Sequence, residues 1–216
     1  MMRLNLETSP GKTLEILCLG AHSDDIEIGC GGTVLRLKEQ YPESKFHWIV
    51  FSAAEVRDAE ARRGAELFAG LSGSRVILKT FRDGFMPFVG GEVKDVFEEL
   101  KKIISPDIIF AHNRRDAHQD HRLLAELTWN TFRDHLILEY EIPKYDGDMG
   151  QPTFYVPLDA DVARKKARYI VETFHSQQSK PWFEESTFLS LMRLRGMECN
   201  APSGYAEAFY SRKIVL

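Results

Sequence analysis

The sequence lacks several features that would place a protein in a special class. No apolar run in its 216 residues approaches the roughly 18 residues that a membrane-spanning helix requires. It has no Lys/Arg-rich block, and its formal net charge is −4, so a general nucleic-acid binder is not indicated. The absence of long low-complexity stretches argues against wholesale disorder. Residues 1–12 are too polar for the apolar part of a signal peptide.

Cysteine is scarce as well. The three cysteines form no CxxC pair, and their odd number does not suggest a disulfide framework, so we expect a reduced, cytoplasmic protein. The hydrophobic content of 44% over this length suits one globular core. Because no composition break or internal repeat marks a second unit, we expect a single domain over residues 1–216.

Apolar runs typical of buried strands alternate with helical patterns along most of the chain. The predicted strands cover residues 14–20, 46–53, 75–81, 107–112 and 136–142. The predicted helices between them cover residues 28–41, 56–71, 93–104 and 119–133. This alternation predicts an α/β fold with a Rossmann-like, mostly parallel sheet and helices on both faces. The less regular last third predicts strands over 153–159 and 211–216, and helices over 161–174 and 183–195.

Two segments rich in His and Asp each follow a predicted strand. GAHSDDIEIGCGG, at 20–32, follows the first strand, and HNRRDAHQDH, at 112–121, follows the fourth. In a doubly wound sheet, strands one and four are neighbours where the strand order reverses, and ligands bind beyond their carboxyl ends. We therefore expect both segments to form one site at the carboxyl ends of strands one and four.

The residue types in these segments suit a catalytic metal site. His22 and Asp25 lie three residues apart and could share one face of a turn, and the second segment would supply another His. Catalytic zinc sites commonly combine three such ligands with a water. Asp24 could then take a proton from that water, while His118, with Asp120 beside it, could give one to a leaving group.

Other interpretations of the first segment must be weighed. Asp24 or Asp25 could simply cap the following helix, since Asp is a favoured N-cap residue. A phosphate-binding GxGxxG motif would have to follow the strand directly, and here the glycines come too late. Gly29, Gly31 and Gly32 are instead predicted to let the start of the helix pack closely against the sheet.

These motifs resemble those of a known family. AHSDDIEIGCGGT is similar to the AHPDDxE motif of the PIG-L/LmbE-like zinc-dependent N-acetylglucosaminyl deacetylases, and RRDAHQDHR to their second metal segment, HxDH. RDAEARRGAELFAGL resembles the family's R-x-x-E helix, and FRDG its acidic turn after strand three. FHSQQSK, MRLRG and YAEAF resemble its C-terminal landmarks, so the resemblance covers nearly the whole chain. Ser23 stands where the family usually has Pro, which concerns the shape of the loop.

The resemblance implies a metal site and an activity. The implied ligands are His22, Asp25 and His121, holding Zn²⁺, although Fe²⁺ suits the same donors. The implied reaction removes the N-acetyl group from an N-acetylated amino sugar or sugar conjugate. The expected partner is therefore that small molecule, with no nucleic acid and no membrane span.

The resemblance also implies roles for further residues. Asp24 would be the general base for the water, and His118 would stabilise the oxyanion and protonate the amine. Asp120 would orient His118 or balance its charge, whereas Arg57 and Asp83 would line the substrate site. The residues themselves leave two alternatives open, a metal-dependent amidase acting on a non-sugar amide and a non-catalytic nucleotide-binding α/β domain.

Overall fold

The computed structural model describes residues 13–70 and 73–215, so the predictions for residues 1–12 and for the helix end at Leu71 lie outside the described residues. The first half of the chain contains β1 (Glu15–His22), α1 (Asp25–Gln40), β2 (Lys45–Ser52), α2 (Val56–Ala69), β3 (Val76–Leu78), η1 (Met86–Val89) and α3 (Gly90–Ile103). The second half contains β4 (Ile108–His112), α4 (Gln119–Thr131), β5 (Leu136–Tyr140), β6 (Phe154–Leu158), α5 (Ala160–Thr173), η2 (His175–Gln177), α6 (Glu185–Glu198) and β7 (Tyr205–Ser211).

The strands of the described residues form one seven-stranded sheet in the order β3-β2-β1-β4-β5-β7-β6. β1 to β5 run parallel, whereas β7 pairs antiparallel with both β5 and β6. β1 lies between β2 and β4, so the strand order reverses at β1 and β4, as predicted. The mostly parallel α/β fold is thereby confirmed.

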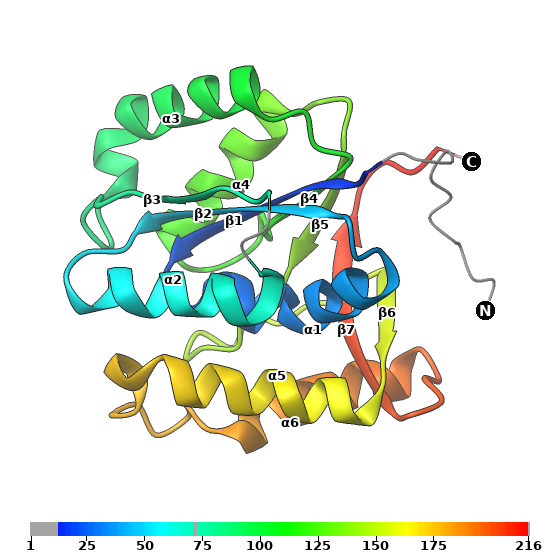
Figure 1. Ribbon diagram of the computed structural model, residues 1–216. Coiled ribbons are helices and arrows are strands. Elements are labelled where there is room, and N and C mark those ends of the chain that lie inside the picture. Colours follow the sequence, from blue (N-terminus) through cyan, green and yellow to red (C-terminus); the bar gives the residue numbers. More distant parts are fainter. Residues whose placement is uncertain (1–12, 71–72, 216) are drawn as a thin grey trace.

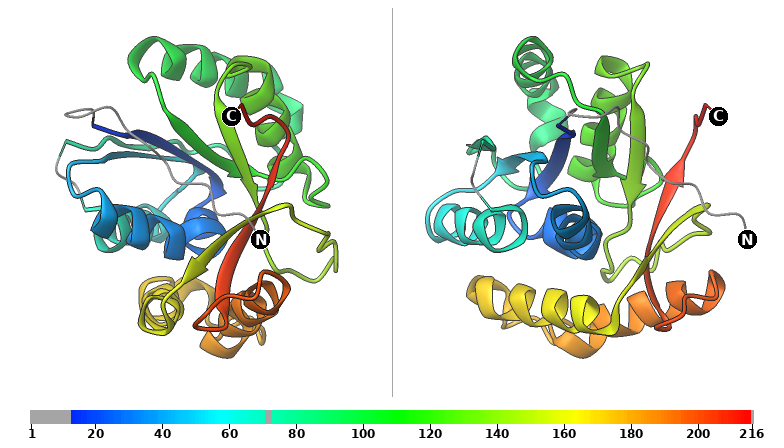
Figure 2. Two further views of the ribbon diagram at one scale, coloured as in Figure 1. Left: turned by 90° about the vertical axis from the view of Figure 1, so that its right-hand side faces the viewer. Right: turned by 45° about the vertical axis from the view of Figure 1, so that its right-hand side comes forward.

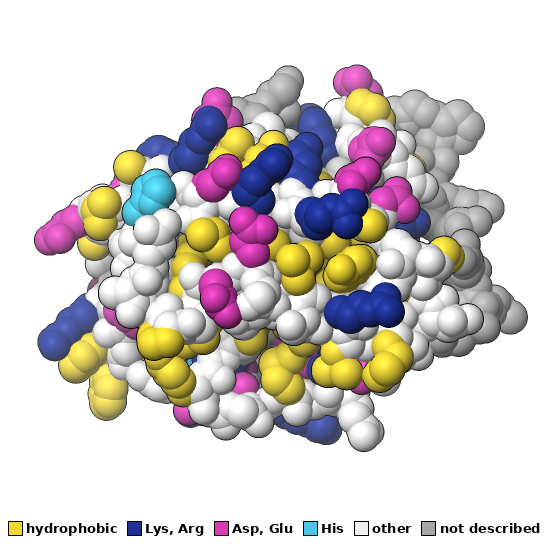
Figure 3. All heavy atoms as spheres, turned by 90° about the horizontal axis from the view of Figure 1, so that it is seen from below, with side chains coloured by type: hydrophobic (Ala, Val, Ile, Leu, Met, Phe, Trp, Pro, Cys, Tyr) yellow, Lys and Arg dark blue, Asp and Glu magenta, His cyan; other side chains and the backbone are white. Residues whose placement is uncertain are grey.

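The helices cover both faces of the sheet and add a further layer (Figure 1). α3 and α4 lie on one face, and α1 and α2 lie on the other. α5 and α6 lie beyond α1 and α2, and the turned views show this outer layer along one side of the molecule (Figure 2). Its outward face mixes hydrophobic, basic and acidic side chains (Figure 3). No helix in the described part of the chain combines the length and the apolar character needed to cross a membrane.

The sheet has one apolar core on each face, and these two cores explain why the apolar runs of the sequence form strands. Trp48 and Phe110 belong to the core that also contains α1 and α2, whereas Phe51 and Phe97 belong to the core under α3 and α4. Along β2, Trp48 and Val50 belong to the first core and Ile49 and Phe51 to the second, as the period of two requires. Burial on both faces makes β1 and β2 almost continuously apolar.

The glycines of α1 serve close packing, as predicted. A Cβ on Gly29 would overlap the ring of Tyr140, whose hydroxyl donates a hydrogen bond of 2.6 Å to the carbonyl of Leu19. A Cβ on Gly31 would lie 2.6 Å from the Phe68 ring, closer than any real contact. These glycines therefore bring the helix that carries Asp25 directly against the sheet and α2.

Replacing Gly29 with Ala should lower the free energy of unfolding by at least about 1–3 kcal/mol, because the Tyr140 ring and its hydrogen bond must shift. Gly91 in α3 is the matched control, since a Cβ there meets nothing within 4 Å. Gly91→Ala should leave stability unchanged or raise it by up to about 1 kcal/mol. Urea unfolding of both variants measures the difference, and equal effects would contradict the packing role of Gly29.

A buried ion pair holds the same helix from the other side. The Glu207 carboxylate on β7 accepts hydrogen bonds from the backbone amides of Gly32 (2.8 Å) and Thr33 (2.6 Å) within α1. Lys166 on α5 donates to Glu207 and to the carbonyl of Ile28, both at 2.6 Å. Both charged side chains are almost fully buried. α1 is thus fixed by two elements from the C-terminal third of the chain.

The structure corrects several boundaries and one strand. α1 begins at Asp25 rather than at residue 28, and β3 is only Val76–Leu78, since Thr80 already makes an isolated bridge with Ser52. The predicted tail strand over 211–216 is wrong, because the strand is Tyr205–Ser211. A buried charge at Glu207 interrupts the apolar alternation there, whereas the apolar tail has no partner strand among the described residues.

Candidate metal centre

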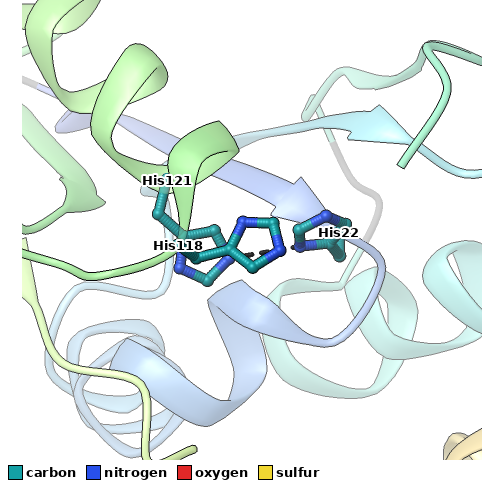
Figure 4. A group of neighbouring side chains, drawn as sticks. All are labelled: His22, His118 and His121. Atoms are coloured by element: carbon teal, nitrogen blue, oxygen red, sulfur yellow. Dashed lines mark hydrogen bonds between the residues drawn. The ribbon is translucent and has the colours of Figure 1, made fainter. Parts of the chain in front are cut away.

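The two His/Asp-rich segments meet at the carboxyl ends of β1 and β4. His22 is the last residue of β1, and Asp25 is the first residue of α1. His118 is the N-cap of α4, and His121 lies in the first turn of that helix. Figure 4 shows the three imidazoles turned toward one another, one from β1 and two from the start of α4.

The three residues expected to be ligands place one donor atom each around a common point. The Nδ1 of His22 lies 3.2 Å from the Nε2 of His121 and 3.3 Å from the Oδ2 of Asp25. The Nε2 of His121 lies 3.4 Å from that same Oδ2. Tetrahedral ligands bound to zinc at about 2.0–2.1 Å are separated by about 3.3 Å. The spacing of these donors therefore fits a tetrahedral divalent cation.

The charges within this group are strongly coupled. Burial by itself raises the pKa of the Asp25 carboxyl, but the nearby charges of His121, His112 and His22 hold it well below its ordinary value. Burial lowers the pKa of His22, yet the charge of Asp25 and contacts with Asp120 and Asp83 raise it well above its ordinary value. This electrostatic field favours a positive charge among the donors, which is what a cation would supply.

The second ring nitrogen of His121 contacts a carboxylate. Its Nδ1 lies 3.0 Å from the Oδ2 of Asp116, and the Lys144 ammonium donates to that oxygen at 2.9 Å. Burial raises the pKa of Asp116, but its contacts with His121, the charge of His112 and the bond from Lys144 lower it well below its usual range. A carboxylate behind a ligating imidazole fixes the tautomer and orientation of the ring. Asp116 was not among the site residues predicted from the sequence.

Asp116→Asn should weaken metal affinity by about 10- to 100-fold, because the amide no longer holds the Nδ1 proton of His121 as a carboxylate does. Competition with a chelator of known affinity measures the change. Asp148→Asn is the control, since Asp148 shares the Lys144 ammonium (2.9 Å) but forms no contact with His121 in the described structure. An unchanged affinity in Asp116→Asn would contradict the orienting role.

His112, the last residue of β4, was not predicted as a site residue, yet it lies against the ligands. Its ring stacks on His121 with centroids 3.9 Å apart, and its Nε2 lies 3.2 Å from the Oδ2 of Asp25. That nitrogen accepts a hydrogen bond of 2.9 Å from the amide of Ala21, so its lone pair is already used. Burial, then the charge of His121, lowers the pKa of His112 to about 4. His112 thus packs against the proposed ligands, and its ligand atom lies within 4.8 Å of those of Asp25 and His121.

Asp24 is the N-cap residue of α1, but its side chain forms no capping hydrogen bond. Its Oδ1 instead accepts a hydrogen bond of 2.6 Å from the Nη2 of Arg57 on α2. Asp24 is buried, whereas about a fifth of the Arg57 side chain is exposed. The capping explanation for Asp24 is therefore not what the structure shows, and the two residues form a partly buried ion pair beside the proposed ligands.

His118 and Asp120 are linked through the backbone. The Nδ1 of His118 accepts a hydrogen bond of 3.3 Å from the amide of Asp120, while the Asp120 carboxylate accepts from the amides of Gly84 (2.7 Å) and Met86 (3.1 Å). Burial, then the charges of His121 and His22, lowers the pKa of His118, and the charge of Asp120 opposes this. Asp120 thus favours the charged form of His118 and also fixes the loop before η1.

Asp83 lies at the open side of the group. Its Oδ1 is 2.9 Å from the Nε2 of His22, although 64% of its side chain is exposed. The contact with His22 comes first among the causes that lower the pKa of Asp83 to about 2. Asp83 thus contacts a predicted ligand directly while remaining accessible from solvent.

Comparison with known proteins places the chain in a family. Residues 17–132, more than half of the chain, match the model described as PIG-L, GlcNAc-PI de-N-acetylase. This match covers all eight site residues predicted from the sequence.

Three solved structures show the same fold. The N,N'-diacetylchitobiose deacetylase from Pyrococcus horikoshii, complexed with its inhibitor MPG, has a TM-score of 0.68 at 19% identity, covering 92% of this chain and 83% of that one. The 4-carboxy-2-hydroxymuconate hydratase GalB from Pseudomonas putida KT2440 has a TM-score of 0.70 at 17% identity, covering 94% and 98%. The zinc-inhibited form of the teicoplanin deacetylase Orf2 has a TM-score of 0.73 at 10% identity, covering 91% and 97%. At these identities the likeness concerns the fold alone.

Proposed function

The chain belongs to the PIG-L family and is an N-deacetylase; on this premise we propose that it hydrolyses the acetamide of an N-acetylated amino sugar or sugar conjugate, with a divalent metal held by His22, Asp25 and His121. The observation that carries the proposal is the spacing of 3.2–3.4 Å between the three donor atoms. Two imidazoles and one carboxylate are a donor set that zinc takes in catalytic sites. We propose Zn²⁺ as the metal, and Fe²⁺ suits the same donors. Two deacetylases with this fold, one of them acting on an acetylated sugar by its name, support the substrate class.

When bound, the metal polarises the amide carbonyl and lowers the pKa of a water toward about 7. Asp24 is the proposed general base that accepts a proton from this water as it attacks the carbonyl carbon. Arg57 holds one oxygen of Asp24, so the carboxylate has a fixed orientation and its other oxygen can receive the proton. The burial of Asp24 limits competing water around it.

The amide nitrogen must gain a proton before the C–N bond breaks. His118 is the proposed acid: its Nδ1 accepts from the amide of Asp120, which leaves Nε2 to carry and donate the proton. Burial and the charges of His121 and His22 lower the pKa of His118, and the charge of Asp120 acts against them in favour of the protonated ring. The products are acetate and a free amine. Arg57 and Asp83, both partly exposed, are the proposed contacts to the sugar.

The phosphate-loop alternative has no support from α1, because its glycines lie inside the helix and not at its start, and Tyr140, Phe68 and Glu207 occupy the space that a Cβ on them would need. The amidase alternative differs only in the substrate. A panel of N-acetylated sugars, sugar conjugates and simple acetamides, incubated with the zinc-loaded protein and scored for free amine, separates them. We expect amine release from at least one acetylated sugar. Release only from a non-sugar amide would overturn the proposed substrate class.

A further inference from the structure

The imidazole of His22 stands between two groups of donor atoms. Its Nδ1 faces Asp25 and His121, which complete the proposed metal centre. Its Nε2 faces the other way, 2.9 Å from the Oδ1 of Asp83 and 3.5 Å from the Oδ2 of Asp120. His118 lies beside this second group, with its ring edge-on to His22 at a centroid distance of 4.9 Å. The ligand atoms of His22, Asp83, His118 and Asp120 all lie within 4.8 Å of one another.

The contacts at Nε2 do not have the geometry of hydrogen bonds. His22 is only 8% exposed, yet its Nε2 has no hydrogen-bond partner among the described residues. Two carboxylate oxygens are nevertheless near it, one of them at a hydrogen-bonding distance. Ligand atoms within 4.8 Å of one another are close enough to share one cation. The Nε2 of the buried His22 thus faces two carboxylates and a second imidazole.

We propose that His22, Asp83, His118 and Asp120 form a second divalent-cation site, which zinc in excess fills and thereby inhibits the enzyme. Two imidazoles and two carboxylates are ligands that zinc binds readily. A second cation bound at the Nε2 of His22 would displace the proton of that nitrogen to solvent, and His22 would then be an imidazolate that contacts both cations. Asp83 leaves the site open to solvent, so the second cation can enter and leave while the first stays bound.

The inhibitory part of this proposal rests on the proposed function. A cation bound to His118 occupies the imidazole that must protonate the amine nitrogen. The same cation binds Asp83, which we propose as a contact to the sugar. Both effects block turnover without removing the metal held by Asp25 and His121, so inhibition should follow the second equivalent of zinc and not the first.

The binding test is equilibrium dialysis of the full chain against increasing zinc, with bound zinc measured by elemental analysis. The wild type should bind two equivalents, whereas Asp83→Asn should lose the second and keep the first. His118→Gln, an independent variant of the same site, should also bind one. Asp161→Asn, which removes an exposed carboxylate on α5, should bind two. A single equivalent in the wild type, or two in both site variants, would overturn the second site.

Amine release measured along the same titration separates the two proposals. We expect activity to rise with the first equivalent and to fall with the second in the wild type. Two bound equivalents without amine release from any substrate would remove the proposed function and leave the second site standing. Activity that stays constant while the second equivalent binds would overturn the inhibition. Activity with only one equivalent bound would overturn the site and leave the function intact.

Discussion

Replacing Asp24 with Asn is expected to lower kcat by about 10²- to 10⁴-fold, the usual contribution of a general base, while the metal stays bound. Asp24 is not among the three side chains whose donor atoms converge at 3.2–3.4 Å. An amide retains the size of the carboxylate and can still meet Arg57, but it cannot accept the proton of the attacking water. The measurements are kcat from amine release and bound metal from elemental analysis on the same sample.

The same two measurements on a variant of Asp25 distinguish the roles of the two adjacent aspartates. Asp25→Asn should lower metal affinity, because Asp25 supplies the anionic ligand of the proposed trio. Asp58→Asn is the control for a charge change nearby, since Asp58 lies on α2 and pairs with Arg62 at the surface. Loss of the metal in Asp24→Asn, with the metal retained in Asp25→Asn, would mean that the two adjacent aspartates have exchanged roles.

Replacing Lys166 with Met should lower the free energy of unfolding by about 3–5 kcal/mol, the cost of leaving a buried charge without its partner. Lys166 and Glu207 are each only 3% exposed in their side chains and lie 2.6 Å apart. Met has a similar length and a high helix propensity, so α5 itself should be little affected. Urea unfolding followed by circular dichroism measures the change, and an unchanged m-value would show that the compactness of the end states is retained.

The matched control lies one half-turn earlier on the same helix. Arg164 pairs with Asp161 at 2.5 Å, but more than half of each side chain is exposed, so Arg164→Met should change stability by no more than about 1 kcal/mol. If both variants lost the same free energy of unfolding, burial would not determine how much the Lys166–Glu207 ion pair contributes to stability. Removing both charges of the buried pair should not restore stability, because the amides of Gly32 and Thr33 would lose their acceptor.

The meeting of the two His/Asp-rich segments in one candidate site could be predicted from the sequence because it depends on local features. His22, Asp25 and His121 follow strands whose apolar runs are plain, and the order of parallel strands brings their carboxyl ends together. The glycines of α1 could be assigned to packing because their spacing after the strand excludes a phosphate loop. In each case the residues of a short stretch of sequence were enough to make the prediction.

The supporting residues could not be predicted, because their roles depend on contacts distant in sequence. His112 receives the amide of Ala21 from another strand, and Asp116 is paired with Lys144 from the loop after β5. The sequence shows His112 at the end of a strand and Asp116 in a polar loop, but it does not show which groups their side chains contact. The strand β7 was not predicted for the same reason. From the sequence alone Glu207 is expected at the surface, and only its contacts with α1 and α5 explain its burial within a strand.

Glu207 also bears on how this family's sequences can be cut and recombined. The segment that matches the family, residues 17–132, contains every proposed ligand, but the carboxylate that fastens the ligand-bearing helix comes from the final strand. The segment that matches the family model therefore contains the proposed reacting residues, but it lacks the Glu207 carboxylate that binds the amides of α1. A chimera that carries residues 17–132 within a different protein would contain the proposed ligands but not Glu207. The host protein would then have to supply an acidic side chain at the amides of Gly32 and Thr33.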